Sequence, residues 1–445
     1  MASVIKKRKH LTSFQLIFLG FIAVILLGAL ILTLPISSSS GRFTPFNEAL
    51  FTSTSAVCVT GLVVQDTATY WSGFGQAIIL ILIQIGGLGV VTLAVSFALL
   101  SGKKLSFSQR STMQSSISAP SVGGVIRLTN FVLKGTAIVE LIGAACMMPV
   151  FIKDHGSRGI WMAFFHSISA FCNAGFDLMG RPENKFASLT SYAGNAYINI
   201  IIMLLIIVGG IGFLTWGDVV TYKFRIKRYR MQSKVVLLTS AILIFVPAVL
   251  FFINDFAQLP IGERVIGSLF QSVTTRTAGF NTLDLTKLTQ TGQAIFIVLM
   301  LIGGSPGSTA GGMKTTTVAV LVSNAISCFA RKEDPEAFGR RIEAGIVKIA
   351  STVLMMYITL CFVGGAVISS IERLPLGVCL FETASAVGTV GLTLGVTPSL
   401  GIASQIILIV LMFLGRVGGL TVIYAAISGS QKKLSKFPEE RITVG

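Results

Sequence analysis

Four short turns, each carrying a glycine and each lying between two apolar stretches, recur at nearly even spacing along the chain. The most distinctive turn is Thr389-Val390-Gly391, and its three counterparts end in Gly61, Gly175 and Gly279. Successive turn glycines are 114, 104 and 112 residues apart. Such regular recurrence indicates duplication of one structural unit, so the fold must accommodate four copies of it.

The composition decides the environment in which these copies fold. Of the 445 residues, 53% are hydrophobic and only 12% are charged, whereas a soluble domain carries about 25% charged residues. The 46 glycines fit the same environment, because small residues allow helices to approach closely in lipid. The sequence therefore predicts a polytopic membrane protein. The apolar run from Leu11 to Leu34 is too long for a signal peptide and predicts a retained membrane helix.

The formal net charge of +17 is explained by membrane topology rather than by nucleic-acid binding. Basic residues are concentrated at the N-terminus, between successive repeats and at the C-terminus, and the intervening loops are nearly neutral. These groups include Lys6 to Lys9, Lys103 to Arg110, Lys223 to Lys234, Arg331 to Lys348, and Lys432 to Arg441. Cytoplasmic loops carry an excess of Lys and Arg, so both termini are predicted to lie in the cytoplasm. No nucleic-acid partner is expected.

Each repeat is predicted to contain an apolar span, a short amphipathic segment, the glycine turn and a second apolar span. The predicted repeats cover residues 11–100, 127–222, 234–330 and 345–428. The second spans are expected at Gln76–Leu100, at Tyr197–Val220, as a broken helix from Gln293 onward, and at Ser404–Ile427. The fold class is all-α, with eight membrane helices and four half-spanning pore helices around one central pore. For the first short helix, Thr44 is predicted as the N-cap and Pro45 as the first helical residue.

A non-helical turn at membrane depth leaves backbone carbonyl groups without hydrogen-bond partners, which costs several kcal/mol per group in lipid. Such turns persist where they are buried in protein or line a water-filled path. Four of them suggest a ring of carbonyl oxygens, which can replace the hydration shell of a monovalent cation. Ordinary re-entrant packing without conduction is the alternative.

Thr389-Val390-Gly391 resembles the core of potassium-channel selectivity filters, and the four repeats resemble the Trk/Ktr/HKT superfamily of cation transporters, most closely its bacterial KtrB-type subunit. The resemblance implies a potassium-binding filter of main-chain carbonyl groups. Its residues would be Val59, Thr60, Gly61, Asn173, Ala174, Gly175, Thr277, Ala278, Gly279, Thr389, Val390 and Gly391. Serine at the first filter glycine accompanies sodium selectivity in that family. Gly61 therefore favours potassium.

A glycine-rich stretch follows the third turn and should break its second span halfway across the bilayer. It lacks the Gly-Lys-Ser/Thr ending of a phosphate-binding loop. The resemblance makes it an intramembrane gate, and a passive kink is the alternative. The predicted gate residues are Gly304, Ser305, Pro306, Gly307, Ser308, Thr309, Ala310, Gly311, Gly312 and, in the fourth repeat, Arg416.

Arg416 lies in the middle of the last apolar span, where a charge costs at least about 2.5–3.5 kcal/mol. We expect it to bind carbonyl groups of the predicted gate and hold it closed, the alternative being a packing charge paired with a carboxylate. Glu48 and Glu382 are expected near the outer mouth, either attracting cations or as solvated caps. Arg276 should face away from the axis and brace the third turn.

The sequence as a whole predicts potassium uptake through a channel-like pore in the cell membrane. A sodium- or proton-coupled secondary transporter is the second hypothesis, and a scaffold or an enzyme is the third. No catalytic residue pair and no covalent cofactor are expected; sodium is left open as an activator. The family resemblance further implies a homodimer bound to a cytosolic nucleotide-binding ring of KtrA-type subunits, and the basic loops could alternatively contact membrane lipids.

Overall fold

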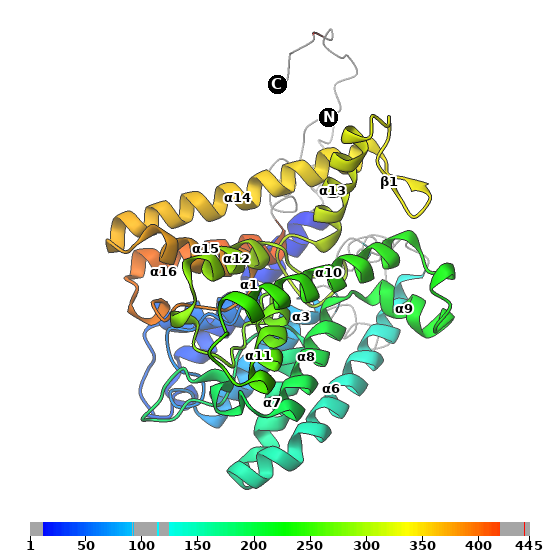
Figure 1. The fold of residues 1–445 in the computed structure, drawn as a ribbon. Helices are drawn as coiled ribbons and strands as arrows, with labels where there is room; N and C mark the ends of the chain where they lie inside the picture. The colour runs from blue at the N-terminus through cyan, green and yellow to red at the C-terminus, as the bar shows by residue number, and fades with distance from the viewer. Residues whose placement is uncertain (1–11, 91, 93–113, 115–123, 419–439, 441–445) are drawn as a thin grey trace, which may run out of the picture.

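The computed structural model describes residues 12–90, 92, 114, 124–418 and 440. Within these residues the chain is almost entirely helical (Figure 1). The predicted ends of the second spans at Leu100 and Ile427 lie outside the described residues. So do the basic groups at 6–9 and 103–110 and the lysines at 432–436.

Four long apolar helices form the outer part of the bundle. They are α1 (Ser13–Thr33), α6 (Val125–His155), α10 (Met231–Asn254) and α14 (Ala344–Glu372). Each is long and apolar enough to cross a membrane. A capping box fixes the start of α1: the Gln15 N–H donates to Thr12 Oγ1, and the Thr12 N–H donates to the Gln15 side chain. The outer helices supply the lipid-facing surface expected of a polytopic membrane protein.

Four shorter helices, the pore helices, pack against these outer helices. They are α2 (Phe46–Val57), α7 (Arg158–Phe171), α11 (Ile261–Thr274) and α15 (Leu376–Gly388). With 12 to 14 residues each, they reach only about 18–21 Å at 1.5 Å per residue, which is less than the thickness of a bilayer. The cap of α2 differs from the prediction by one residue, because Pro45 is the N-cap and the helix begins at Phe46.

The inner helices are less regular than predicted. They are α3 (Gly73–Leu88), α8 (Ala196–Gly210), α9 (Phe213–Tyr222), α12 (Gln290–Leu301), α13 (Thr315–Phe329) and α16 (Ile402–Val417). The third is broken between α12 and α13, at the glycine-rich stretch. The second was predicted as one continuous helix over Tyr197–Val220, which is wrong: α8 and α9 meet at 101°. Gly212, with φ of 89°, lies in this bend.

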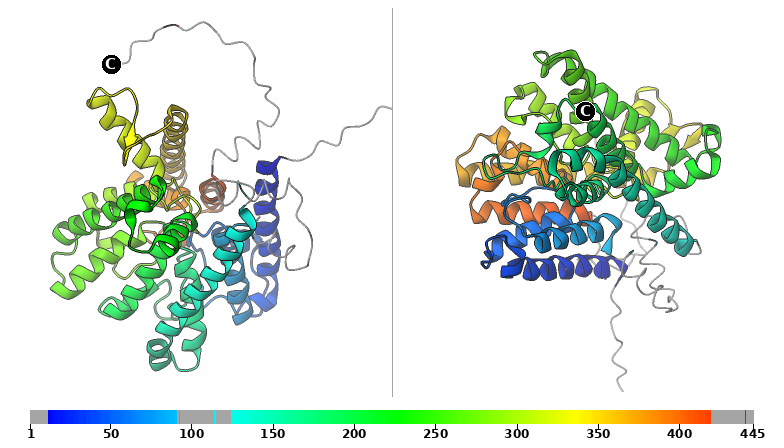
Figure 2. Two further views of the ribbon diagram at one scale, coloured as in Figure 1. Left: turned by 90° about the vertical axis from the view of Figure 1, so that its right-hand side faces the viewer. Right: turned by 90° about the horizontal axis from the view of Figure 1, so that it is seen from below.

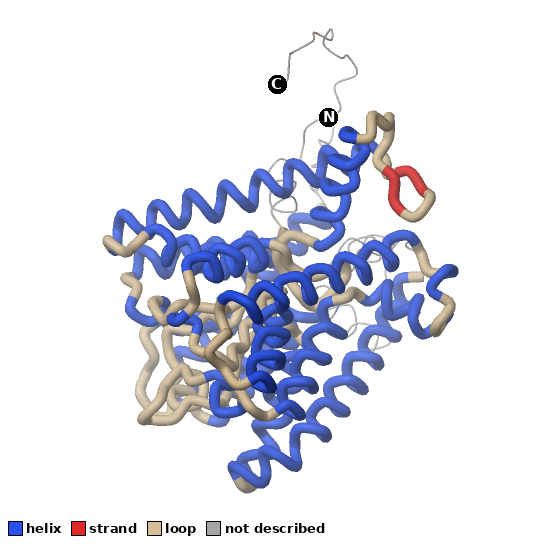
Figure 3. Tube along the Cα trace, viewed as in Figure 1, coloured by secondary structure: helices blue, strands red, loops and turns tan. Residues whose placement is uncertain are grey.

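The helices close into a ring of four segments. The inner helix of each segment contacts the pore helix of the next: α3 lies on α7, α8 on α11, α12 on α15, and α16 on α2. The colours of the four segments follow one another around the molecule when it is viewed from below (Figure 2). Loops gather toward one end of the bundle (Figure 3), and they include the segments that follow the four turns. The chain order thus becomes a circular order in space.

Within the described residues, the elements outside this arrangement are small. Strands β1 (Glu336–Ala337) and β2 (Arg340–Arg341) form an antiparallel hairpin between α13 and α14, with Glu336 opposite Arg341. Short 3-10 turns connect other elements: η1 (Pro35–Ser37), η2 (Ser188–Tyr192), η3 (Ile226–Arg228), η4 (Leu285–Lys287) and η5 (Thr397–Ser399).

Candidate functional site: four turns at the centre of the ring

The four predicted filter turns share one backbone conformation. The first residue of each turn has a positive φ, namely Val59 at 56°, Asn173 at 58°, Thr277 at 64° and Thr389 at 51°. The third residue is always glycine, also with positive φ: Gly61 at 91°, Gly175 at 69°, Gly279 at 83° and Gly391 at 93°. The first and third residues of each turn are thus left-handed, and glycine is the residue that tolerates the second of these two positions.

Each pore helix binds its turn through backbone hydrogen bonds. The N–H of the middle residue donates to the carbonyl of a hydroxyl-bearing residue one turn back in the helix. These pairs are Thr60 with Ser55, Ala174 with Ser169, Ala278 with Thr274, and Val390 with Ser385, at 2.8 to 2.9 Å. No carbonyl oxygen of the four turns accepts a hydrogen bond from the described residues. The turns therefore present unpaired acceptors, and the C-terminal ends of the pore helices add negative potential beside them.

The four glycines lie against one another in a closed cycle. A Cβ atom added to Gly61 would lie 2.5 Å from the carbonyl oxygen of Ala174, and one added to Gly175 would lie 2.7 Å from that of Ala278. A Cβ on Gly279 would overlap the carbonyl oxygen of Val390, and one on Gly391 would overlap that of Thr60. Each turn thus contacts the next, and the fourth contacts the first. The structure brings all twelve predicted filter residues into this one ring.

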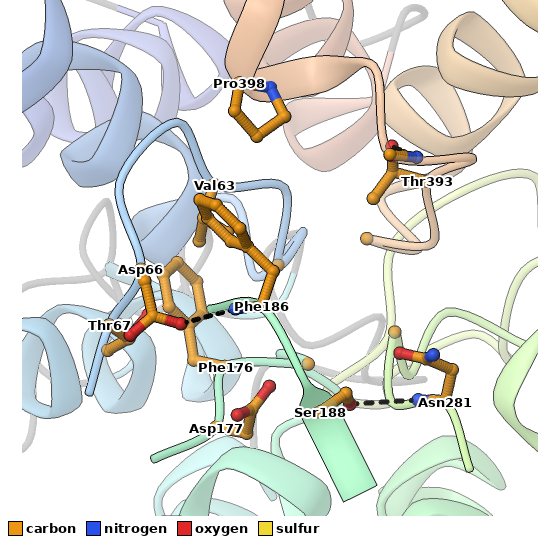
Figure 4. A pocket seen from close by; sticks show the side chains of 15 residues that line it. Val63, Asp66, Thr67, Phe176, Asp177, Phe186, Ser188, Asn281, Thr393 and Pro398 are labelled. Carbon is orange, nitrogen blue, oxygen red and sulfur yellow. Dashed lines mark hydrogen bonds between the residues drawn. The ribbon is translucent and has the colours of Figure 1, made fainter. Parts of the chain in front are cut away.

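A cavity of about 100 Å³ opens on one side of the ring (Figure 4). All four turn glycines line it, together with Asp66, Asp177, Phe186, Asn281 and Thr393 among others. The Asp66 carboxylate accepts hydrogen bonds from the N–H groups of Thr69 (2.9 Å) and Phe186 (2.8 Å), so it shapes the wall. We call this cavity the mouth.

Asp177 contributes a carboxyl group to the mouth that sequence reasoning did not select. It directly follows Phe176 in the second turn, and its Oδ1 accepts a hydrogen bond from the Met179 N–H at 3.0 Å. Burial raises the pKa of Asp177 to about 7, and the nearby Asp66 charge raises it further against the hydrogen bonds that lower it. This group therefore changes charge near neutral pH, beside the ring.

The predicted gate residues from Gly304 to Gly312 lie in the segment between α12 and α13. The Ser305 N–H donates to the Gly210 carbonyl at 2.9 Å, and the Phe213 N–H donates to the Gly307 carbonyl at 2.7 Å. Thr309 Oγ1 donates to the Phe171 carbonyl at 3.0 Å, at the end of the second pore helix. The segment, which we call the 302–314 loop, is therefore bonded to the α8–α9 bend and lies directly under the second turn.

Arg416 connects this loop to the first segment. Its guanidinium donates to the carbonyl oxygens of Thr309 in the loop and of Gly86 and Gly87 at the end of α3. In the described part of the chain it forms no ion pair with a carboxylate. A single side chain of the fourth segment thus bridges the third and the first, and one of its three carbonyl partners, that of Thr309, belongs to the loop.

Two further sequence expectations can be compared with the structure. Arg276 is buried and its Nη2 donates to Ser240 Oγ of α10 at 3.1 Å, so it faces away from the ring as predicted. Glu382 was expected either to attract cations at the mouth or to cap a helix in solvent. It does neither, because its side chain is 1% exposed and accepts hydrogen bonds from Thr393, Leu394 and Thr397.

The model of the TrkH family, described as cation transport proteins, matches residues 6–436. The chain belongs to the TrkH family. Its Trk/Ktr resemblance is thereby confirmed, and so is its assignment to a family of multi-pass membrane cation transporters.

Two relatives of this TrkH-family chain match it over nearly their whole length. The potassium/sodium uptake protein NtpJ of Enterococcus hirae is 40% identical, with 100% of each chain covered. The Ktr system potassium uptake protein B of Bacillus subtilis is 37% identical over 97% of this chain and 96% of its own. The crystal structure of the potassium transporter TrkH from Vibrio parahaemolyticus superimposes with a TM-score of 0.70, at 18% identity, covering 94% of this chain and 85% of its own. This similarity confirms the predicted all-α membrane fold.

Proposed function

We propose that this chain takes up potassium across the cell membrane through the centre of its ring, with the four turns as a carbonyl selectivity filter. The observation that carries the proposal is the closed cycle of four turns whose carbonyl groups have no partner among the described residues. The names of NtpJ and Ktr protein B, a potassium/sodium uptake protein and a potassium uptake protein, support it. The membrane potential would drive entry with about 2.3 kcal/mol per charge for each 100 mV.

The 302–314 loop and Arg416 would form the gate under this filter. The loop contacts the second turn through the bond from Thr309 Oγ1 to Asn173 Oδ1 at 3.2 Å, and the fourth through Gly311, where an added Cβ would overlap Thr389 Oγ1. A permeating ion must pass this segment. Its bonds to the α8–α9 bend and to Arg416 supply a closed state that can be released.

A sodium- or proton-coupled transporter remains the second hypothesis, and flux in proteoliposomes separates the two. The purified protein is reconstituted, and uptake of radioactive rubidium is followed under an imposed potential without sodium and at equal pH on both sides. A channel-like pore predicts uptake under the potential alone. Uptake that requires a sodium or proton gradient would contradict the proposal in favour of coupling.

We also propose partners for the chain, from its similarity to Ktr protein B. The chain would form a homodimer on a cytosolic ring of KtrA-type nucleotide-binding subunits, with both termini in the cytoplasm. Exposed basic residues of the β1–β2 hairpin, Arg340 and Arg341, are available there for the ring or for anionic lipid headgroups. Sodium could act on the assembly as an activator, and potassium at the turn carbonyl groups is the transported ion.

A further inference from the structure

A polar residue occupies one equivalent position in all four pore helices. It directly follows a fully buried phenylalanine, and every copy is at most 1% exposed. The four residues are Thr52, His166, Gln271 and Glu382. Burial of a polar side chain is costly unless it is hydrogen-bonded, so the partners of this position indicate what it does.

In the second and fourth segments the partner is the same backbone group. The Leu178 N–H donates to His166 Nε2 at 3.3 Å, and the Leu394 N–H donates to Glu382 Oε1 at 3.0 Å. Leu178 and Leu394 each lie three residues after the turn glycine. Each of these pore-helix side chains is therefore hydrogen-bonded to the backbone three residues after the glycine of its own turn.

The fourth segment is held most firmly. Glu382 also accepts hydrogen bonds from the hydroxyl groups of Thr393 and Thr397, each at 2.6 Å. Thr393 lines the mouth (Figure 4), so this carboxyl group connects the inside of the pore helix to the wall of the ion path. In the second segment, a 2.7 Å contact between His166 Nδ1 and the Met162 carbonyl makes Nδ1 the donor and leaves Nε2 as the acceptor.

The other two segments lack this contact. Thr52 Oγ1 and both amide atoms of Gln271 have no hydrogen-bond partner among the described residues. Since the segments contact one another in chain order, the second and fourth turns lie opposite each other across the ring. The side chain at this position thus bonds the backbone outside the turn at two opposite corners of the ring, and it makes no such bond at the two corners between them.

We infer that Glu382 and His166 are positioning residues that hold the fourth and second turns in the geometry required for ion selection. The inference rests on the proposed filter function. A turn that loses this hydrogen bond to its pore helix can widen and admit a hydrated or smaller ion. Ion selectivity should therefore change more than the rate of flux. Neither residue contacts the ion path directly through its own side chain.

Selectivity measurements on Glu382 variants test this inference. Rubidium uptake in proteoliposomes is measured in competition with sodium for wild type, Glu382→Gln and Glu382→Ala. We expect Glu382→Ala to lower the preference for rubidium by about tenfold or more, since removing the carboxyl group leaves three donors without their acceptor. Glu382→Gln keeps an acceptor oxygen for Leu394 and should recover most of the preference.

The matched control is Glu372. Its Oε1 accepts from the Gly401 N–H at 2.9 Å and from Ser404 Oγ at 2.6 Å, so it makes the same kinds of bond at the start of α16 and not at a turn. Glu372→Ala should leave the selectivity ratio within about twofold of wild type.

The possible results separate failure of the proposed pore from failure of the inference about Glu382. Absence of rubidium flux in wild type would overturn the proposed pore and not this inference alone. A folded Glu382→Ala protein with wild-type selectivity would overturn the inference while leaving the pore intact. If Glu382→Ala does not fold, Thr397→Val decides instead: it keeps the side-chain volume, removes one of the bonds, and must lower the ratio for the inference to stand.

Discussion

At the scale of single residues, both the backbone conformation and the neighbouring turn restrict the four turn positions to glycine. Positive φ values disfavour any side chain there by about 1–2 kcal/mol, and the neighbouring turn occupies the space a Cβ would need. The two constraints are separable, because Gly41 has a φ of 66° and nothing within 4 Å of its added Cβ. Crowding between turns, rather than backbone strain, is what ties these residues to the ring.

Gly61→Ser should therefore reduce the preference for potassium over sodium by about tenfold, a factor corresponding to 1.4 kcal/mol. The serine Cβ would push against the Ala174 carbonyl and displace two turns at once. Competition between rubidium and sodium uptake measures the change. Gly41→Ser introduces strain without crowding and should retain wild-type selectivity; an equal loss in both variants would assign the effect to strain.

Asp177 predicts a dependence of uptake on external pH. With its pKa raised to about 7, the carboxyl group is neutral in acid and ionised in mild base. At low potassium concentration, uptake should fall severalfold as the external pH drops from about 8 to about 6, because the mouth loses an attractive charge. Asp177→Asn should show the low uptake at both values.

The same shift has a consequence for stability. A carboxyl group whose pKa is raised on folding binds more protons in the native state, so stability is highest in acid and declines between about pH 4 and pH 7. Asp177→Asn should remove this part of the decline. The control for the pH dependence of uptake is Asp284, whose pKa is lowered by its hydrogen bond from Thr286. Asp284→Asn should leave the pH profile of uptake unchanged.

At the scale of secondary structure elements, the inner helices carry the irregularities. The α12–α13 break, the α8–α9 bend and the C-terminal end of α3 meet through backbone carbonyl groups, and Arg416 is the side chain that joins the loop to α3. A guanidinium can donate to several carbonyl groups in one plane, which a lysine cannot. The contact is therefore specific to the shape of arginine as well as its charge.

Arg416→Lys distinguishes a clamp from a charge barrier. If Arg416 holds the loop, both Arg416→Ala and Arg416→Lys should raise basal rubidium flux severalfold, because lysine loses the simultaneous bonds to Thr309 and Gly86. If only its charge opposed cations, Arg416→Lys would behave as wild type. Proteoliposome flux without partner subunits gives the answer, and unchanged flux in both variants would contradict a gating role.

Sequence reasoning reached the glycine turns, the short pore helices and the break after Leu301, because glycine, proline and apolar periodicity act locally. It missed the α8–α9 bend: Gly209, Gly210 and Gly212 resemble glycines of a continuous membrane helix, and the bend is bonded to a loop far along the chain. It also misplaced Glu382, since the burial of a carboxyl group depends on threonines that follow the turn. The bend thus depends on a contact between two segments, and the burial of Glu382 depends on how the chain folds after its own turn. Neither can be read from the local pattern of glycine and apolar residues.

At the scale of the whole molecule, the ring makes one binding site from segments spread over some 330 residues of chain, from Gly61 to Gly391. Each inner helix packs on the next pore helix, so displacement of one turn is transmitted to its neighbours. A cation at the centre would contact all four segments at once. Its binding should therefore stabilise the assembled bundle rather than one repeat.

Thermal unfolding in detergent tests this coupling. By mass action, potassium at a hundred times its dissociation constant should stabilise the native state by about 2.7 kcal/mol, seen as a higher Tm than in a large organic cation at equal ionic strength. Sodium should raise the Tm less, and Gly61→Ser should reduce the difference between the two ions. Because the ring closes through all four turns, Gly279→Ser in the opposite half should have the same effect. A potassium-dependent shift that survives both substitutions would place the ion elsewhere and contradict a single central site.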